Sequence, residues 1–165
     1  MPDQRALDHW APDLQTSDPI ALLSGAVEAR TRPVESAVAI AQALEAAPQD
    51  LDIRLAAYRF YFYNHDHKAA LAQAEVILAL SAQRLNLPQD WRLVQPGERD
   101  FTTPAFATGL YLQALIAIGY CAARTGAADL AHAALTQARS LDPSDRFGGA
   151  WLLGLIEARD DAEDD

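Results

Sequence analysis

The sequence predicts an all-α protein of paired antiparallel helices, and three observations support this fold class. Apolar residues recur at helix spacing along most of the chain. Cap residues, Pro and Gly divide it into segments of helix length. One pattern of small and large positions occurs twice with the same internal spacing. With 165 residues, half of them apolar, the chain is long enough for one domain with its own core.

Residues 112–145 carry the most complete helix–turn–helix pattern. Gly119 and Ala131 lack bulk where two helices must approach closely, and large side chains fill the space around them: Leu115, Ile118 and Leu135. Gly126 can end the first helix in the left-handed conformation, and Pro143 stops the second. The stretch therefore predicts a helical hairpin with defined ends.

Residues 17–50 repeat this pattern, after a weakly patterned N-terminal segment at 1–16. The first helix starts at Ser17-Asp18-Pro19 and runs to about residue 30, and the second runs from Pro33 to just before Pro48. The positions that match those of the 112–145 unit are Ile20, Leu23, Ser24, Ser36, Ile40 and Pro48. A recurrence at fixed spacing favours a repeat architecture.

Residues 51–84 form a second unit with the same plan. Asp50 is a helix cap, the first helix runs through about Tyr63, and residues 64–66 form the turn. The second helix keeps its apolar period as far as Leu85.

An insertion at 85–111 separates the second and third units. A 34-residue period would start the third unit at 85, whereas it starts near 112. Thr103-Pro104 predicts a cap and first turn that lengthen the next helix to 104–125, leaving a loop at 86–103. Three residues of this loop could either fold back on the body or contact a partner: Trp91, Arg92 and Phe101.

The C-terminal part predicts a helix at 144–158 that covers the end of the stack, followed by an acidic tail at 159–165. Ser144 is the expected cap, and Phe147, Trp151, Leu152 and Leu155 give the helix an apolar face. The tail is expected to be solvated.

Together, residues 17–158 resemble the tetratricopeptide repeat (TPR) family. The resemblance implies an α-solenoid of about three repeats plus a capping helix, with a concave groove lined by the first helix of each pair. The matching groove positions are Leu55, Arg59, Phe62, Tyr63, Ile116, Tyr120, Arg124 and Trp151. The chain is also similar to class II chaperones of type III secretion, which are small acidic TPR proteins that bind extended translocator segments. The Lys and Asn pattern of the family's carboxylate clamp is not matched.

The groove positions combine aromatics with arginines, residue types that often dominate binding energy. The alternative is that Phe62, Tyr120 and Trp151 are core residues between helices. The helix at 105–123 is apolar nearly all the way round, so either its neighbours or a second subunit must cover it. A monomer and a homodimer both remain open.

The net charge of −10 argues against nucleic acid or anionic lipid and favours a basic protein segment as partner. No run of eighteen apolar residues free of charge and no secretory signal is expected, which favours a cytoplasmic protein without membrane attachment. The single cysteine, Cys121, suits a reducing compartment and is expected to be buried.

These observations predict an adaptor or chaperone that binds a segment of a partner protein, without a cofactor or metal and without enzymatic activity. One alternative is a structural, self-assembling scaffold. A second is a metal-dependent enzyme that uses the His65-Asp66-His67 turn, although side chains adjacent in a turn tend to point apart and a metal needs three or four converging ligands.

Overall fold

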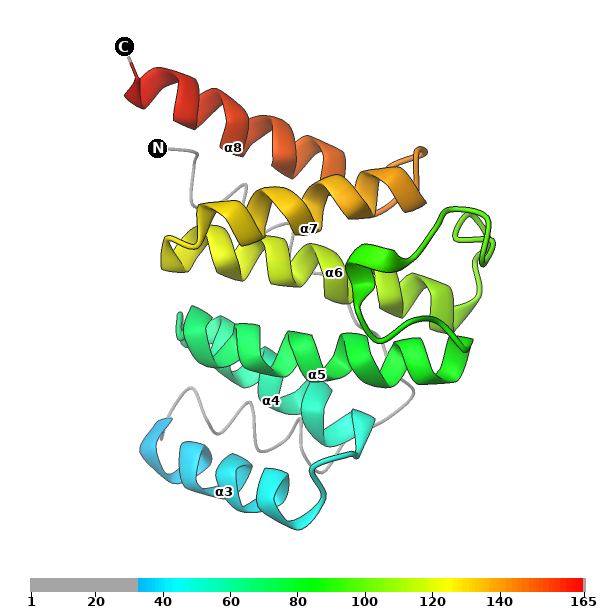
Figure 1. Ribbon diagram of the computed structural model, residues 1–165. Coiled ribbons are helices and arrows are strands. Elements are labelled where there is room, and N and C mark those ends of the chain that lie inside the picture. The colour runs from blue at the N-terminus through cyan, green and yellow to red at the C-terminus, as the bar shows by residue number, and fades with distance from the viewer. Residues whose placement is uncertain (1–32, 165) are drawn as a thin grey trace.

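The computed structural model describes residues 33–164, with side chains from residue 37, and the regular secondary structure of this part consists of helices, without strands (Figure 1). The all-α prediction is thus confirmed for it. The helices are α3 (Pro33–Ala46), α4 (Leu51–Tyr63), α5 (His67–Leu85), α6 (Phe106–Thr125), α7 (Ala128–Leu141) and α8 (Gly149–Glu163), with a short 3₁₀ helix, η1 (Trp91–Leu93). The predicted segment at 1–16 and the first helix at 17–30 lie outside the described residues.

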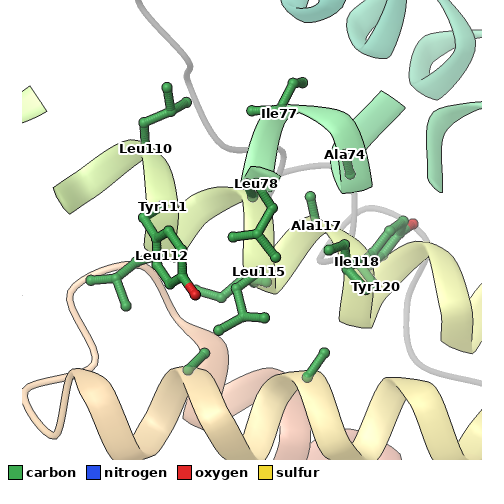
Figure 2. Close-up of a cluster of buried hydrophobic side chains, with 14 of the residues drawn as sticks. Ala74, Ile77, Leu78, Leu110, Tyr111, Leu112, Leu115, Ala117, Ile118 and Tyr120 are labelled. Atoms are coloured by element: carbon green, nitrogen blue, oxygen red, sulfur yellow. The ribbon is translucent and has the colours of Figure 1, made fainter. Parts of the chain in front are cut away.

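Each helix packs against the helices before and after it in the chain, and α6 also contacts α8. Figure 1 shows the resulting stack, from α3 at one end to α8 at the other. The core is centred on α6, where Leu112, Leu115 and Ile118 are at most 1% exposed. Figure 2 shows Leu78 of α5 pointing toward Leu115 of α6. An apolar helix in the middle of the stack is therefore covered by its own neighbours.

The hairpin of α4 and α5 begins and turns as predicted. The Asp50 carboxylate accepts hydrogen bonds from the backbone N–H groups of Asp52 (2.9 Å) and Ile53 (3.2 Å) at the start of α4. Asp66 caps α5 by accepting from the Ala69 N–H at 3.1 Å. Because these side chains satisfy amide groups that have no partner within the helix, they set where each helix begins.

The hairpin of α6 and α7 has the predicted close approach. A Cβ atom added to Gly119 would lie 2.5 Å from Leu135 Cγ, so only glycine allows the two helices this spacing. Ala131 is completely buried on α7. Gly126 ends α6 with φ of 84°, a conformation that glycine adopts without strain.

The chain between α5 and α6 packs on the body of the protein. Val94 and Phe101 are 2% and 1% exposed and belong to the main core. The helix that follows starts at Phe106, two residues after the predicted start, with Ala105 in an extended conformation as its cap. This segment, residues 86–105, is called the strap below.

The last helix differs from the prediction at both ends. It begins at Gly149 rather than at 144, because Gly148 takes a φ of 78° and the Asp145 carboxylate accepts from the Ala150 N–H at 2.8 Å. Ser144, the predicted cap, instead donates its hydroxyl to Asp142. At the other end α8 continues to Glu163, so most of the predicted tail at 159–165 is helical.

Helix α6 is also long and apolar enough to cross a membrane by length and composition. Its 18-residue window has a mean hydropathy of 1.5, and 78% of that window is buried inside the protein. Sequence analysis expected no such apolar run free of charge and so overlooked residues 101–123, which carry no charged side chain. The burial is typical of a central core helix.

Candidate binding surfaces

Four of the eight predicted groove residues lie inside the protein. Leu55, Phe62, Ile116 and Tyr120 are between 1% and 5% exposed. The rings of Phe62 and Tyr120 join α4 to α6, with centroids 5.4 Å apart. The alternative interpretation as core residues therefore describes Phe62 and Tyr120, and these four side chains offer no surface to a partner in this conformation.

The other four groove residues reach the surface, but not at one place. Tyr63 is 55% exposed at the end of α4, and Arg124 is exposed in the last turn of α6. The Tyr63 ring packs on Phe62, with centroids 5.6 Å apart, and Arg124 lies one helical turn after Tyr120, so both residues flank the contact between Phe62 and Tyr120. Arg59, which is half-buried, precedes Tyr63 by one turn of α4. These three residues form what we call the α4–α6 end surface.

Trp151 lies apart from that surface. It is 47% exposed in the first turn of α8, which meets α6 at Ile116, where a Cβ on Gly149 would lie 3.1 Å from Ile116 Cδ1. Eight residues of α6 separate Ile116 from Arg124, or about 12 Å along the helix axis. The exposed groove residues are thus divided between the middle of α6, near Trp151, and its C-terminal end.

The His65-Asp66-His67 turn has one side chain facing the core and two facing solvent. His67 is only 9% exposed, and its ring lies 5.7 Å from that of Tyr120 and 6.1 Å from that of Phe62. His65 is exposed, and Asp66 uses its carboxylate to cap α5. Within residues 33–164, no group of three or more His, Cys, Asp or Glu side chains could hold a metal ion.

Cys121 is completely buried, as expected. Burial raises the pKa of its thiol to about 12, and the neighbouring Tyr58 hydroxyl offsets a part of the increase. The reactive thiolate is therefore scarce at neutral pH.

We expect native protein at pH 8 to resist Ellman's reagent, because a pKa of about 12 leaves only about one thiol in 10⁴ ionised. In concentrated guanidinium chloride the single thiol should react completely. Absorbance of the released thionitrobenzoate measures both rates. Rapid labelling of the folded protein would show that α6 opens readily around Cys121.

The strap is held in place by three polar side chains. Gln137 of α7 donates its Nε2 group to the carbonyl oxygens of Trp91 (2.9 Å) and Val94 (2.7 Å). Arg99 donates to the Leu85 carbonyl at 2.7 Å. Arg146 donates to the carbonyls of Phe101 and Thr103. The strap is thus tied to α5, to α7 and to the turn before α8.

Of the three strap residues that sequence analysis singled out, two are accessible. Trp91 is half-buried and Arg92 is exposed, with the Arg92 guanidinium 4.2 Å from the centre of the Trp91 ring. Phe101 is buried and packs on Tyr111, with ring centroids 5.6 Å apart. Phe101 therefore anchors the strap, and Trp91 and Arg92 remain available for contacts.

A hollow of about 280 Å³ lies between α5 and the strap, and we call it the α5–strap hollow. Leu78 and Ile118 are at its floor, Trp91 forms a wall, and Glu75, Asp90 and Arg92 contribute charged groups. Sequence analysis identified Trp91 and Arg92 but missed Glu75 and Asp90. No sequence signal pairs these two acids, since they meet only because the strap folds back onto α5.

The chain matches no family model, and no solved structure matches it. It is 34% identical over 118 residues to a protein of Azotobacter chroococcum mcd 1 described as "Uncharacterized 19.8 kDa protein in nifW 5'region". The aligned region covers 70% of this chain and 65% of that relative. The chain therefore spans a little less than two thirds of the relative's length.

Proposed function

We propose that this protein is a TPR-type adaptor or chaperone that acts in the cytoplasm and binds a segment of a partner protein. The observation that carries the proposal is the way the described helices contact one another. First and second helices of the predicted pairs alternate along the chain. The first helices, α4 and α6, and the capping helix α8 contact one another in turn across the stack. Phe62 of α4 meets Tyr120 of α6, and Ile116 of α6 meets the start of α8.

The packing of the intervening helices supports the same arrangement. Helix α5 packs against both α4 and α6, and α7 packs against both α6 and α8. In a solenoid each repeat contacts only its neighbours, and its binding surface comes from one helix of each repeat. A TPR-like stack is what the sequence resemblance implies for these residues, and the contacts are compatible with it.

The α4–α6 end surface is the proposed place of contact. Arg59, Tyr63 and Arg124 combine an exposed aromatic ring with two guanidinium groups. A tyrosine supplies a large rigid contact area, and an arginine supplies forked hydrogen-bond donors for carbonyl or carboxylate oxygens. Four of the predicted positions are instead buried, so the proposed contact is smaller than the whole predicted groove.

The name of the relative suggests a source of partner proteins. That name places its gene in the 5′ region of nifW. We therefore propose lysates of cells that express such a region as the source of partner proteins.

We expect the variant Tyr63→Ala/Arg124→Ala to recover at least tenfold less partner protein from such a lysate than the wild-type protein does. Truncating an aromatic and an arginine at the centre of a contact commonly costs 2 kcal/mol or more, roughly thirtyfold in affinity. The measurement is affinity capture followed by quantitative mass spectrometry. Circular dichroism must show the same helix content and thermal midpoint for both proteins.

The matched control is Phe106→Ala/Arg139→Ala, which removes an exposed aromatic and an exposed basic side chain outside both proposed binding sites. It should retain the partner. Equal recovery by wild type and by Tyr63→Ala/Arg124→Ala would exclude the α4–α6 end surface as the contact.

A further inference from the structure

We propose that the α5–strap hollow binds one lysine or arginine side chain carried on a segment of a partner protein. The inference deepens the proposed function, on which it rests for the kind of partner, and it names a second site and its chemistry. The site is separate from the α4–α6 end surface, because it is built from α5, the strap and one residue of α6.

The size of the hollow matches a single long side chain. Its volume is about 280 Å³, below the range of roughly 300–1,000 Å³ that is usual for pockets that bind small molecules. It is open on one side, so a side chain can enter from an extended or helical segment that passes across its mouth.

The floor and wall suit the aliphatic part of such a side chain. Leu78 and Ile118 are 3% and 1% exposed, and they give the floor an apolar surface. The Trp91 indole stands at one side. Lysine and arginine bury their methylene groups along apolar surface while the charged end stays near water, and this combination of surfaces favours them over a fully apolar side chain.

The rim supplies negative charge from two directions. Glu75 comes from α5 and Asp90 from the strap, and both are exposed. Glu75 makes no hydrogen bond or ion pair with the residues that the structure describes. The one basic group at the rim, Arg92, already stacks on Trp91 and lies 3.8 Å from Asp90. An incoming cation therefore finds Glu75 without a competing partner.

The rim is also preorganised. Gln137 holds the carbonyls of Trp91 and Val94, and the Asp90 carboxylate accepts from the Arg92 N–H at 3.0 Å. Because the strap is fixed before binding, little conformational entropy is lost when a side chain enters. The net charge of −10 adds a long-range attraction for basic segments.

The test uses the fluorescence of Trp91 in the 165-residue chain carrying Trp10→Phe and Trp151→Phe, since the chain has three tryptophans. The probe is an acetylated and amidated pentapeptide with a central lysine flanked by leucine and alanine. We expect a saturable change in Trp91 emission at low salt, and binding at least fivefold weaker for the same peptide with glutamate in place of lysine.

Substitutions separate the local site from the overall charge. Glu75→Gln should lower the affinity for the lysine peptide about three- to fivefold, as expected for the loss of one partly exposed ion pair. The matched control Glu45→Gln, on the exposed face of α3, removes the same charge elsewhere and should leave the affinity unchanged. Tyr63→Ala/Arg124→Ala should also leave the peptide affinity unchanged. The proposal for the α4–α6 end surface and the proposal for the hollow can therefore be refuted independently.

Three outcomes would overturn the proposal. The first is equal binding of the glutamate peptide, and the second is an equal effect of Glu75→Gln and Glu45→Gln. The third is binding of putrescine as tight as that of the lysine peptide, which would make the occupant a free amine rather than a protein segment.

Discussion

Replacing Phe101 by alanine is expected to lower the free energy of unfolding by about 3–5 kcal/mol, the usual cost of removing a buried phenylalanine ring. Phe101 is 1% exposed and packs on the ring of Tyr111, which is completely buried. Its carbonyl oxygen also accepts a hydrogen bond from Arg146. Loss of the ring therefore removes core contacts and loosens the strap at the same time.

Urea denaturation followed by circular dichroism measures the change, and trypsin tests the strap directly. With the strap released, Arg92 and Arg99 should be cleaved well before the helices. The matched control is Phe106→Ala, because Phe106 is 52% exposed and its loss should change stability by no more than about 0.5 kcal/mol. Equal stability of Phe101→Ala and wild type would mean that the strap is not part of the cooperative fold.

Gly119→Val is expected to destabilise the protein by about 1–3 kcal/mol or more, because it overfills the contact between α6 and α7. A Cβ at this position would lie 2.5 Å from Leu135 Cγ and 2.7 Å from Leu135 Cδ2. Leu135 is completely buried and has little room to move aside. The two helices would have to separate.

Gly154→Val provides the matched control within another helix. No atom lies within 4 Å of a Cβ at Gly154, so this change should be neutral or slightly stabilising, since valine is a better helix former than glycine. A double-mutant cycle with Leu135→Ala identifies the cause. If the clash is responsible, the double variant will lose less stability than the sum of the two single variants. Strict additivity would contradict this account.

Much of the helical framework could be predicted because local chemistry decides it. Asp50 and Asp66 cap their helices with their own carboxylates, and Gly126 adopts the left-handed conformation that ends α6. Each of these residues acts on backbone groups only a few positions away in the sequence. The start of α8 was missed for a related reason, because Ser144 and Asp145 both have side chains able to cap a helix, and only the left-handed turn at Gly148 favours Asp145.

The binding surface was less predictable, because helix spacing shows which residues share a face but not what covers that face. Tyr63 and Phe62 are neighbours in the sequence, yet one is 55% exposed and the other 5%. The difference arises from Tyr120, whose ring lies against Phe62 from another helix. Burial of this kind depends on contacts between distant segments, which a single sequence does not specify.

By itself, the amino-acid sequence determined the helical class, the turns of the α4–α5 and α6–α7 hairpins and the close contact at Gly119, because backbone conformation and residue size act locally. Only the tertiary structure decided that the strap folds back on the core through Phe101 and that Glu75 and Asp90 face one hollow. These features depend on long-range packing and on hydrogen bonds such as those of Gln137, which join residues more than forty positions apart.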